Sequence, residues 1–317
     1  MSSQEVTFNC SREDARAYRL SRKTNDGNFS LYPGIITVNP DSASHTHKNL
    51  WETEETLVPS RDYVRGSAAH DNHILPISGG DRVLITAEHA TQQIRTRADG
   101  SKFEKEEDEG TGALAYVVAT QTKSSALIAI GRQTGDPNND AEHTFKEEIE
   151  KITALPVNEA FLSVHGISRA IASDAQSPIG YSVFLGYGDT PSDASRTLAH
   201  DYLEPAAKDM GLTIGTNQRF ISFNAETNYP LRKIVDKSLV TRVFKASGNT
   251  SRAYAESVAR NHGKEDYVAL QIELSAVLRC LQDESIWSTQ EDRELGAWLG
   301  YQFLKTAVES VEKLRHP

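Results

Sequence analysis

From Asp81 onward, short and nearly continuous apolar runs alternate with segments of helical length. This alternation restricts the possible folds more than any other feature of the sequence. The runs are rich in β-branched residues and lie at 82–86, 126–130, 160–164, 182–185 and 267–272. The intervening segments predict helices at 111–122, 145–154, 192–210, 250–262, 274–280 and 289–314. Apolar runs of this length are typical of strands buried on both faces, and their alternation with helices favours parallel pairing. We therefore predict an α/β fold with a mixed, mostly parallel central sheet and helices on both of its faces.

Residues 1–80 differ from the rest of the chain. They are polar and rich in turn residues, and only short apolar pieces such as 34–38 interrupt them. Segments of this composition bury little apolar surface by themselves. We predict an N-terminal extension over residues 1–80 that packs on a main domain formed by residues 81–317.

The charge of the chain argues against one large class of function. Its 34 Lys and Arg residues against 44 Asp and Glu residues give a formal net charge of −10 at pH 7, which is unsuited to binding a phosphate backbone. Its apolar runs are far shorter than the ~20 residues of a membrane span. The charged start is unlike a secretory signal, and two distant cysteines favour a reducing compartment. We expect a cytoplasmic protein that acts on a small molecule, without nucleic acid or membrane partners.

Reactive side chains follow four of the predicted strands. These are Glu88 and His89 after 82–86, Arg132 after 126–130, His165 after 160–164, and Glu273 after 267–272. Ligands of open α/β sheets bind outside the carboxyl ends of the strands, so these side chains are expected to converge. Two histidines and one carboxylate are a ligand set of catalytic zinc sites. Each histidine, taken alone, is explained as a hydrogen-bonded core residue, and the two together at separate strand ends favour this and a metal site about equally.

Asp108 is the first candidate for the carboxylate ligand, because Gly110, Thr111 and a predicted helix follow it and would fix its backbone. A carboxylate at this position is also common as a favourable charge at a helix N-terminus, and this alternative stays open. Glu109, the next residue, is the main alternative as the carboxylate ligand. Glu88 is a weaker one, because successive residues of a strand point to opposite faces.

Five short segments occur in a characteristic order: Glu88–Ala90, Asp108–Thr111, Arg132–Asn138, Val164–Gly166, and Gln271–Ser275 followed by Arg279. In this order they resemble the motifs of the N-formylglutamate amidohydrolase family, which belongs to the same broad fold group as the zinc carboxypeptidases. The chain departs from the family pattern at Asn139, where the family has arginine, and at Ser163, where it has aspartate.

The resemblance implies a zinc carboxypeptidase-like fold and a zinc ion (Zn²⁺) held by His89, Asp108 and His165. It implies that Glu273 takes a proton from the attacking water and returns it to the leaving amine. Arg132 would stabilise the oxyanion or bind a substrate carboxylate, unless it forms a structural ion pair with Asp136.

Substrate binding is less specified. Asn138 and Arg169 are further candidates for contacts with substrate, and the implied substrate is an amide, either an N-acyl amino acid or a small peptide. A specialised peptidase or deacylase of the same fold is an alternative, suggested by the extension and by Asn139. A metal-free binding protein is another, suggested by Ser163 and by Gln92.

Overall fold

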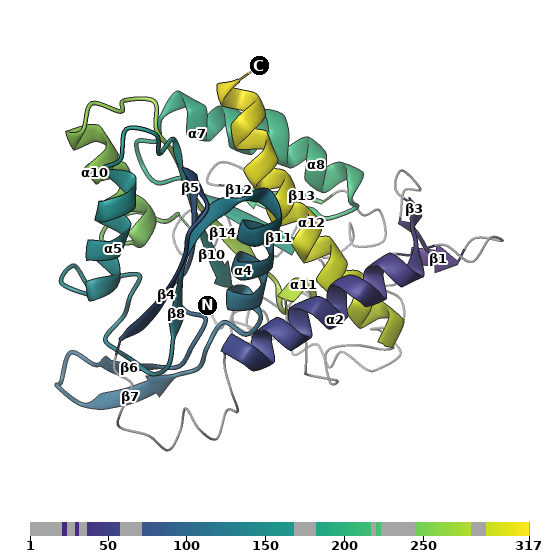
Figure 1. Ribbon diagram of the computed structural model, residues 1–317, viewed down its shortest axis with the longest axis horizontal. Coiled ribbons are helices and arrows are strands. Elements are labelled where there is room, and N and C mark those ends of the chain that lie inside the picture. The colour runs from purple at the N-terminus through teal and green to yellow at the C-terminus, as the bar shows by residue number, and fades with distance from the viewer. Residues whose placement is uncertain are drawn as a thin grey trace, which may run out of the picture.

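A computed structural model describes residues 21–23, 29–31, 37–57, 72–167, 182–216, 220–222, 245–279 and 290–316. Its main sheet contains β4 (His73–Ile77), β5 (Gly80–Ala87), β8 (Ser124–Ile130), β10 (Ala160–Gly166), β11 (Ser182–Gly186), β12 (Thr213–Thr216), β13 (Phe220–Ser222) and β14 (Val268–Leu274). Within the described residues, the strand order is β13-β12-β11-β14-β10-β5-β8-β4 (Figure 1). The central strands β8, β5, β10 and β14 are parallel, whereas β4, β11 and β13 each pair antiparallel with a neighbour. The predicted mixed, mostly parallel sheet is confirmed.

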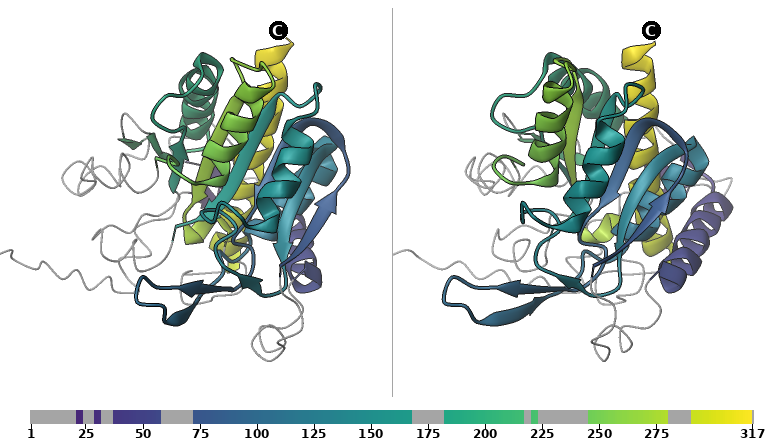
Figure 2. Two further views of the ribbon diagram at one scale, coloured as in Figure 1. Left: turned by 90° about the vertical axis from the view of Figure 1, so that its left-hand side faces the viewer. Right: turned by 60° about the vertical axis from the view of Figure 1, so that its left-hand side comes forward.

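Helices cover both faces of this sheet (Figure 2). They are α4 (Thr111–Thr122), α5 (Thr144–Thr153), α10 (Ser251–Asn261), α11 (Ala276–Arg279) and α12 (Gln290–Arg315). Alternate strand residues point to opposite faces, and they form two separate apolar clusters. One cluster joins Leu84 and Phe161 to α5 and α10, and the other joins Ile85 and Leu162 to α4 and α12. The three-layer α/β/α arrangement is therefore confirmed. Among the described residues, none of the helices combines the length and apolar composition needed to cross a bilayer.

The predicted helix 192–210 is divided in the structure. It consists of α7 (Asp193–Thr197), the π-helix η1 (Leu198–Leu203) and α8 (Glu204–Asp209). Pro205 lies in the first turn of α8 and has no N–H to donate, so regular α-helical bonding does not continue through it. A π-helical turn accommodates this local change of bonding.

Residues 1–80 contribute more regular structure than their composition indicates. Strands β1 (Ser21–Lys23), β2 (Phe29–Leu31) and β3 (Thr37–Val38) form an antiparallel sheet, and β4 joins the edge of the main sheet. Helix α2 (Pro40–Leu57) packs against α4 and α12. It was not predicted because its buried apolar stripe is sparse, with Ala43 and Leu50 as its fully buried members. The division of the chain at residue 80 stays a prediction.

Glu54 of α2 is buried against α4 and accepts hydrogen bonds from the backbone N–H groups of Gly110 and Ala113. Burial raises the pKa of Glu54 from 4.5 to about 7. A carboxyl with a raised pKa in the folded state adds stability below its unfolded pKa, and this contribution is lost as the pH rises through about 7. We therefore expect Glu54→Gln to gain thermal stability relative to the wild type as the pH rises from about 5 to 8. Circular-dichroism melts of the two proteins test this, and a difference independent of pH would contradict it.

A second small sheet lies beside the carboxyl end of the main sheet. It consists of β6 (Gln93–Thr96), β7 (Lys102–Lys105) and β9 (Gln133–Thr134). Strands β6 and β7 form a hairpin that projects from the body of the molecule in both views of Figure 2. Its turn contains Asp99 and Gly100, and Gly100 has a φ of 83°, which favours glycine.

Candidate metal centre

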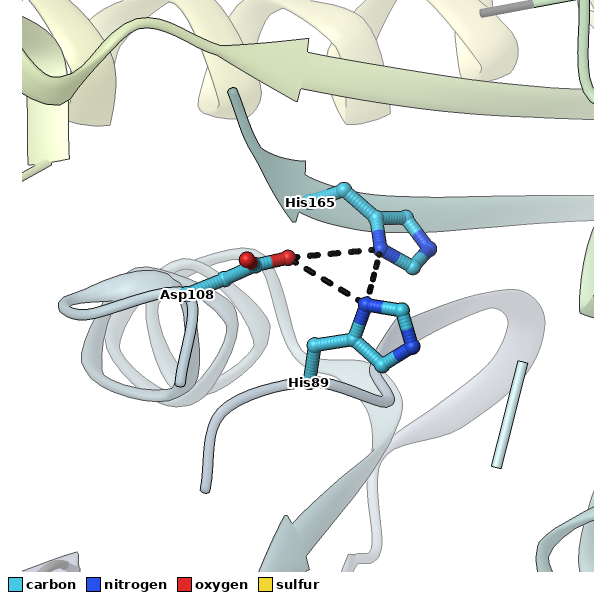
Figure 3. A group of neighbouring side chains, drawn as sticks. All are labelled: His89, Asp108 and His165. Carbon is cyan, nitrogen blue, oxygen red and sulfur yellow. Dashed lines mark hydrogen bonds and ion pairs between the residues drawn. The ribbon is translucent and has the colours of Figure 1, made fainter. Parts of the chain in front are cut away.

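His89, Asp108 and His165 converge at the carboxyl end of the sheet, as Figure 3 shows. The two Nδ1 atoms of the histidines are 3.2 Å apart. Oδ2 of Asp108 lies 3.4 Å from Nδ1 of His89 and 3.6 Å from Nδ1 of His165. All three side chains are buried. The sequence interpretation that brought these three residues together agrees with this geometry.

Three different elements supply the three side chains. His89 lies two residues beyond β5, His165 is the last residue but one of β10, and Asp108 lies in the loop before α4. Backbone hydrogen bonds connect these elements directly. Asp108 donates its N–H to the carbonyl of His89 at 2.7 Å, and the N–H of Gly166 donates to Oδ2 of Asp108 at 3.0 Å. The loop is thereby held against both histidine-bearing segments.

The spacing of the three inward atoms fits a small tetrahedrally coordinated cation. Zinc bonds to nitrogen and oxygen are about 2.0–2.2 Å long, which places neighbouring ligand atoms about 3.3–3.6 Å apart in a tetrahedron. The observed separations are 3.2, 3.4 and 3.6 Å. A divalent cation therefore fits between these atoms with little change in the positions of the side chains.

The outer nitrogen of His89 contacts a carboxylate. Its Nε2 lies 2.9 Å from Oδ1 of Asp136. Burial alone would raise the pKa of Asp136, but the bond to His89 and the charge of Arg95 outweigh it and hold the pKa far below its usual range. An ionised carboxylate only accepts hydrogen bonds, so Asp136 favours a hydrogen on Nε2 of His89, and a cation at the centre would be bound through the lone pair of Nδ1. This is the carboxylate–histidine pairing that orients metal ligands.

The outer nitrogen of His165 reaches a carboxylate through a serine. Nε2 of His165 lies 2.8 Å from Oγ of Ser163, and Ser163 donates to Glu88 at 3.0 Å. Thr86 also donates to Glu88, at 2.9 Å. Oε2 of Glu88 also lies 3.4 Å from Nε2 of His165, so this carboxylate lies directly behind the histidine. The sequence interpretation missed this, because the relay joins residues on two different strands.

The charges around the histidines favour a cation at the centre. Burial would raise the pKa of Asp108, but hydrogen bonds from His165 and His89 outweigh it and hold the pKa well below its ordinary value. Burial would lower the pKa of His165, but the bond with Asp108 and the charges of Glu88 and Glu273 raise it. The negative charge of these buried carboxylates stabilises a proton on His165. It would stabilise a divalent cation bound in place of that proton for the same reason.

Glu273 lies beside this centre. It is the register partner of His165 on the neighbouring parallel strand β14, and it is buried. Gln271 donates a hydrogen bond to Oε1 of Glu273 at 2.7 Å, which orients the carboxyl group. Burial raises the pKa of Glu273 above its ordinary value, although His165 opposes this. Such a carboxyl holds a proton more readily than an exposed glutamate.

The predicted substrate-binding residues are placed differently. Arg132 forms an ion pair with Glu104 of β7, whereas the sequence interpretation had Asp136 as its possible partner. Asn138 accepts a hydrogen bond from the N–H of Ser251 at 2.8 Å and so helps to hold the start of α10. Arg169 lies outside the described residues.

Two cations of the β6–β7 hairpin contact the centre and were not predicted as site residues. Arg95 places Nη2 3.1 Å from Nε2 of His89 and Nη1 2.9 Å from Oδ2 of Asp136. Lys105 places Nζ 3.7 Å from Oδ1 of Asp108 and 3.5 Å from Nδ1 of His89. The hairpin had a sequence signal, since Asp99 and Gly100 stand between two short alternating segments, which is typical of a tight β-turn.

The choice between Asp108 and Glu109 as ligand can be tested directly. Asp108→Asn is expected to weaken zinc affinity by at least the tenfold to hundredfold that is typical of disturbing an outer partner of a metal site. Glu109→Gln should change the affinity little, because the group of inward-facing ligand atoms includes Asp108 and not Glu109. Competition with a chromophoric chelator measures both affinities. The reverse ranking would make Glu109 the ligand.

Comparison with known proteins gives limited similarity. No family model matches the chain, and no curated protein matches it. Among solved structures, a bacteriophage poly-gamma-glutamate hydrolase is 14% identical with a TM-score of 0.37, and the match covers 79% of this chain and 91% of that one. The product-bound cell shape determinant Csd4 from Helicobacter pylori is 13% identical with a TM-score of 0.38, over 78% of this chain and 56% of that one. Leucyl aminopeptidase from Trypanosoma cruzi is 10% identical with a TM-score of 0.29, over 72% and 49%.

Proposed function

We propose that this protein is a zinc-dependent hydrolase of a carbon–nitrogen bond in an N-acyl amino acid or a small peptide. The proposal joins the resemblance to N-formylglutamate amidohydrolases with the geometry of His89, Asp108 and His165. The observation that carries it is the convergence of three buried ligand atoms within 3.6 Å of one another. Both histidines also have an outer partner that fixes their orientation, Asp136 for His89 and Ser163 with Glu88 for His165.

The three residues would hold the zinc ion through Nδ1, Oδ2 and Nδ1. A bound zinc ion supplies a Lewis acid that polarises the scissile carbonyl and makes water a better nucleophile at neutral pH. Three protein ligands are the usual number for a catalytic zinc site, because a fourth position must stay open. The donor set of two imidazoles and one carboxylate is one that zinc accepts.

Glu273 is the proposed general base. It takes a proton from the attacking water and passes it to the nitrogen of the leaving amine. Its buried position raises its pKa, which brings the carboxyl closer to the working pH than an exposed glutamate. Its position beside His165 in the sheet register supports a role at the same reacting group.

Cations at the site are proposed to bind the anionic parts of substrate and transition state. Arg132 keeps its proposed role on the oxyanion or a substrate carboxylate, which requires its ion pair with Glu104 to open. Arg95 and Lys105 are added to it, because Arg95 contacts His89 and Lys105 contacts Asp108. Asn138 and Arg169 stay proposed contacts with substrate.

Hydrolysis of a defined panel of amides tests the proposal. The panel contains N-formyl and N-acetyl amino acids and short peptides, and the release of free amine is measured. We expect zinc-loaded protein to hydrolyse at least one class, to lose that activity after treatment with a chelator, and to regain it with added zinc. An activity that survives both the chelator and His165→Ala would contradict a metal-dependent mechanism.

A further inference from the structure

The loop that carries Asp108 ends in a helix start without a capping side chain of its own. Gly110 is the N-cap residue of α4, with φ 78° and no side chain to accept from the first free N–H groups. A helix N-terminus leaves such N–H groups unpaired, and a side-chain oxygen at the N-cap normally accepts from one of them. A Cβ at position 110 would collide with the carbonyl oxygen of Arg279. The local geometry therefore excludes a capping side chain at this position.

Glu54 supplies the missing acceptors from a distant part of the chain. Its Oε1 accepts from the N–H of Gly110 at 3.0 Å, and its Oε2 accepts from the N–H of Ala113 at 3.3 Å. Glu54 belongs to α2, which packs against α4. A helix of the N-terminal segment thus completes the start of the helix that follows Asp108.

Arg279 and Thr111 also hold the loop that carries Asp108. Nη1 of Arg279 donates to the carbonyl of Glu109 at 2.7 Å, and its Nη2 donates to the carbonyl of Ile167 at 3.1 Å. Thr111 donates both its N–H and its hydroxyl to the carbonyl of Asp108. The contacts of Glu54 add an anchor from outside the main sheet, close to the proposed metal ligand.

The burial of Glu54 is unfavourable in itself. The side chain is almost fully buried, and among the described residues its carboxylate accepts only from the two amides. Its charged neighbours Glu107 and Glu109 have the same sign. Burying a carboxylate without a cation costs free energy, whereas an apolar residue would pack α2 on α4 without that cost. A role in holding the backbone at Gly110 and Ala113 explains why a carboxylate occupies this buried position.

We propose that Glu54 is a positioning residue that fixes the Asp108 loop, so that helix α2 completes the metal centre. The inference rests on the proposed function, in which Asp108 binds zinc. Helix α2 (residues 40–57) would then contribute to metal binding as well as pack on the main domain. A metal ligand must be held in place before the ion binds, and a loosened loop lowers affinity without removing any ligand.

Four variants separate positioning from general stability. Glu54→Ala removes both acceptors, and Glu54→Gln keeps a carbonyl oxygen for the N–H of Gly110. Leu50→Ala creates a cavity on the buried side of the same helix but leaves both acceptors of Glu54 in place, and Glu55→Gln removes a charge from the exposed neighbour of Glu54. Zinc affinity is measured by chelator competition under conditions in which every variant is folded. Hydrogen exchange of the amides of residues 108–113 is measured without metal.

We expect Glu54→Ala to lose about tenfold to hundredfold in zinc affinity and Glu54→Gln to lose less. Both should show faster exchange at residues 108–113, most strongly in Glu54→Ala. Leu50→Ala should lower the melting temperature while keeping the zinc affinity and the exchange of this loop, and Glu55→Gln should resemble the wild type. Wild-type affinity and exchange in Glu54→Ala, or an equal loss of affinity in Leu50→Ala, would overturn the proposal.

The two proposals fail in different ways. A wild-type protein that binds no zinc would contradict the proposed function. The exchange measurement does not require the metal, so it decides in either case whether Glu54 holds the Asp108 loop.

Discussion

His89→Ala and His165→Ala are each expected to abolish zinc binding and hydrolysis while the protein stays folded. Each substitution removes one of three inward ligand atoms, and catalytic zinc sites with three protein ligands seldom tolerate the loss of one. Both histidines lie at the carboxyl edge, so the apolar clusters that join the sheet to its helices stay in place. Zinc content by mass spectrometry and melting by circular dichroism measure the two effects.

A histidine outside the centre provides the matched control. His200 lies on η1, where its Nδ1 is 2.8 Å from Glu204 and its Nε2 is 3.1 Å from the hydroxyl of Tyr187. His200→Ala should reduce stability and leave the zinc content at one ion per chain. Near wild-type zinc content in His89→Ala or His165→Ala would remove that histidine from the site.

Glu273→Gln is expected to retain zinc and to lower kcat by about 10² to 10⁴, the usual contribution of general acid–base catalysis. The amide preserves the size of the side chain and its bond with Gln271, but it cannot take a proton. Steady-state kinetics at saturating zinc, together with the zinc content of the same sample, separate the two roles.

Glu88→Gln is the matched control for Glu273→Gln. Glu88 accepts from Ser163 and Thr86 behind His165, so its substitution should weaken zinc affinity more than it lowers kcat at saturating zinc. Full activity of Glu273→Gln would show that another carboxylate is the base. A loss of kcat in Glu88→Gln at full zinc occupancy would identify Glu88 as that base.

The central sheet was predictable because its strands are buried on both faces. Strand β14 is buried over its whole length and β10 is buried except at Gly166, so their sequences contain nearly continuous apolar runs. Parallel strands bring their carboxyl ends to one edge, which is why His89 and His165 were expected to meet. Their meeting needs only the direction of the strands and no detail of side-chain packing.

The partners of the histidines were not predictable in the same way. Glu88 follows β5 and contacts both Ser163 and His165 of β10, so the pairing depends on the register of β5 with β10. Asp136 bonds to His89 and to Arg95, and this depends on how the β6–β7 hairpin folds back. Such contacts follow from tertiary structure, on which the local pattern of a sequence carries little information.

Helix α2 was missed for a different physical reason. Its sequence is polar, and most of its stability comes from packing on α4 and α12. The buried carboxylate of Glu54 has no counterpart in an amphipathic pattern, because charged residues are expected on the exposed face of a helix.

Anomalous scattering at the zinc absorption edge, from crystals grown with zinc, shows whether His89, Asp108 and His165 bind the ion. We expect one strong peak per chain at about 2.0–2.2 Å from Nδ1 of His89, Oδ2 of Asp108 and Nδ1 of His165. A zinc peak beside other residues would contradict the proposed site. The absence of a peak between these three atoms at a saturating zinc concentration would also contradict it.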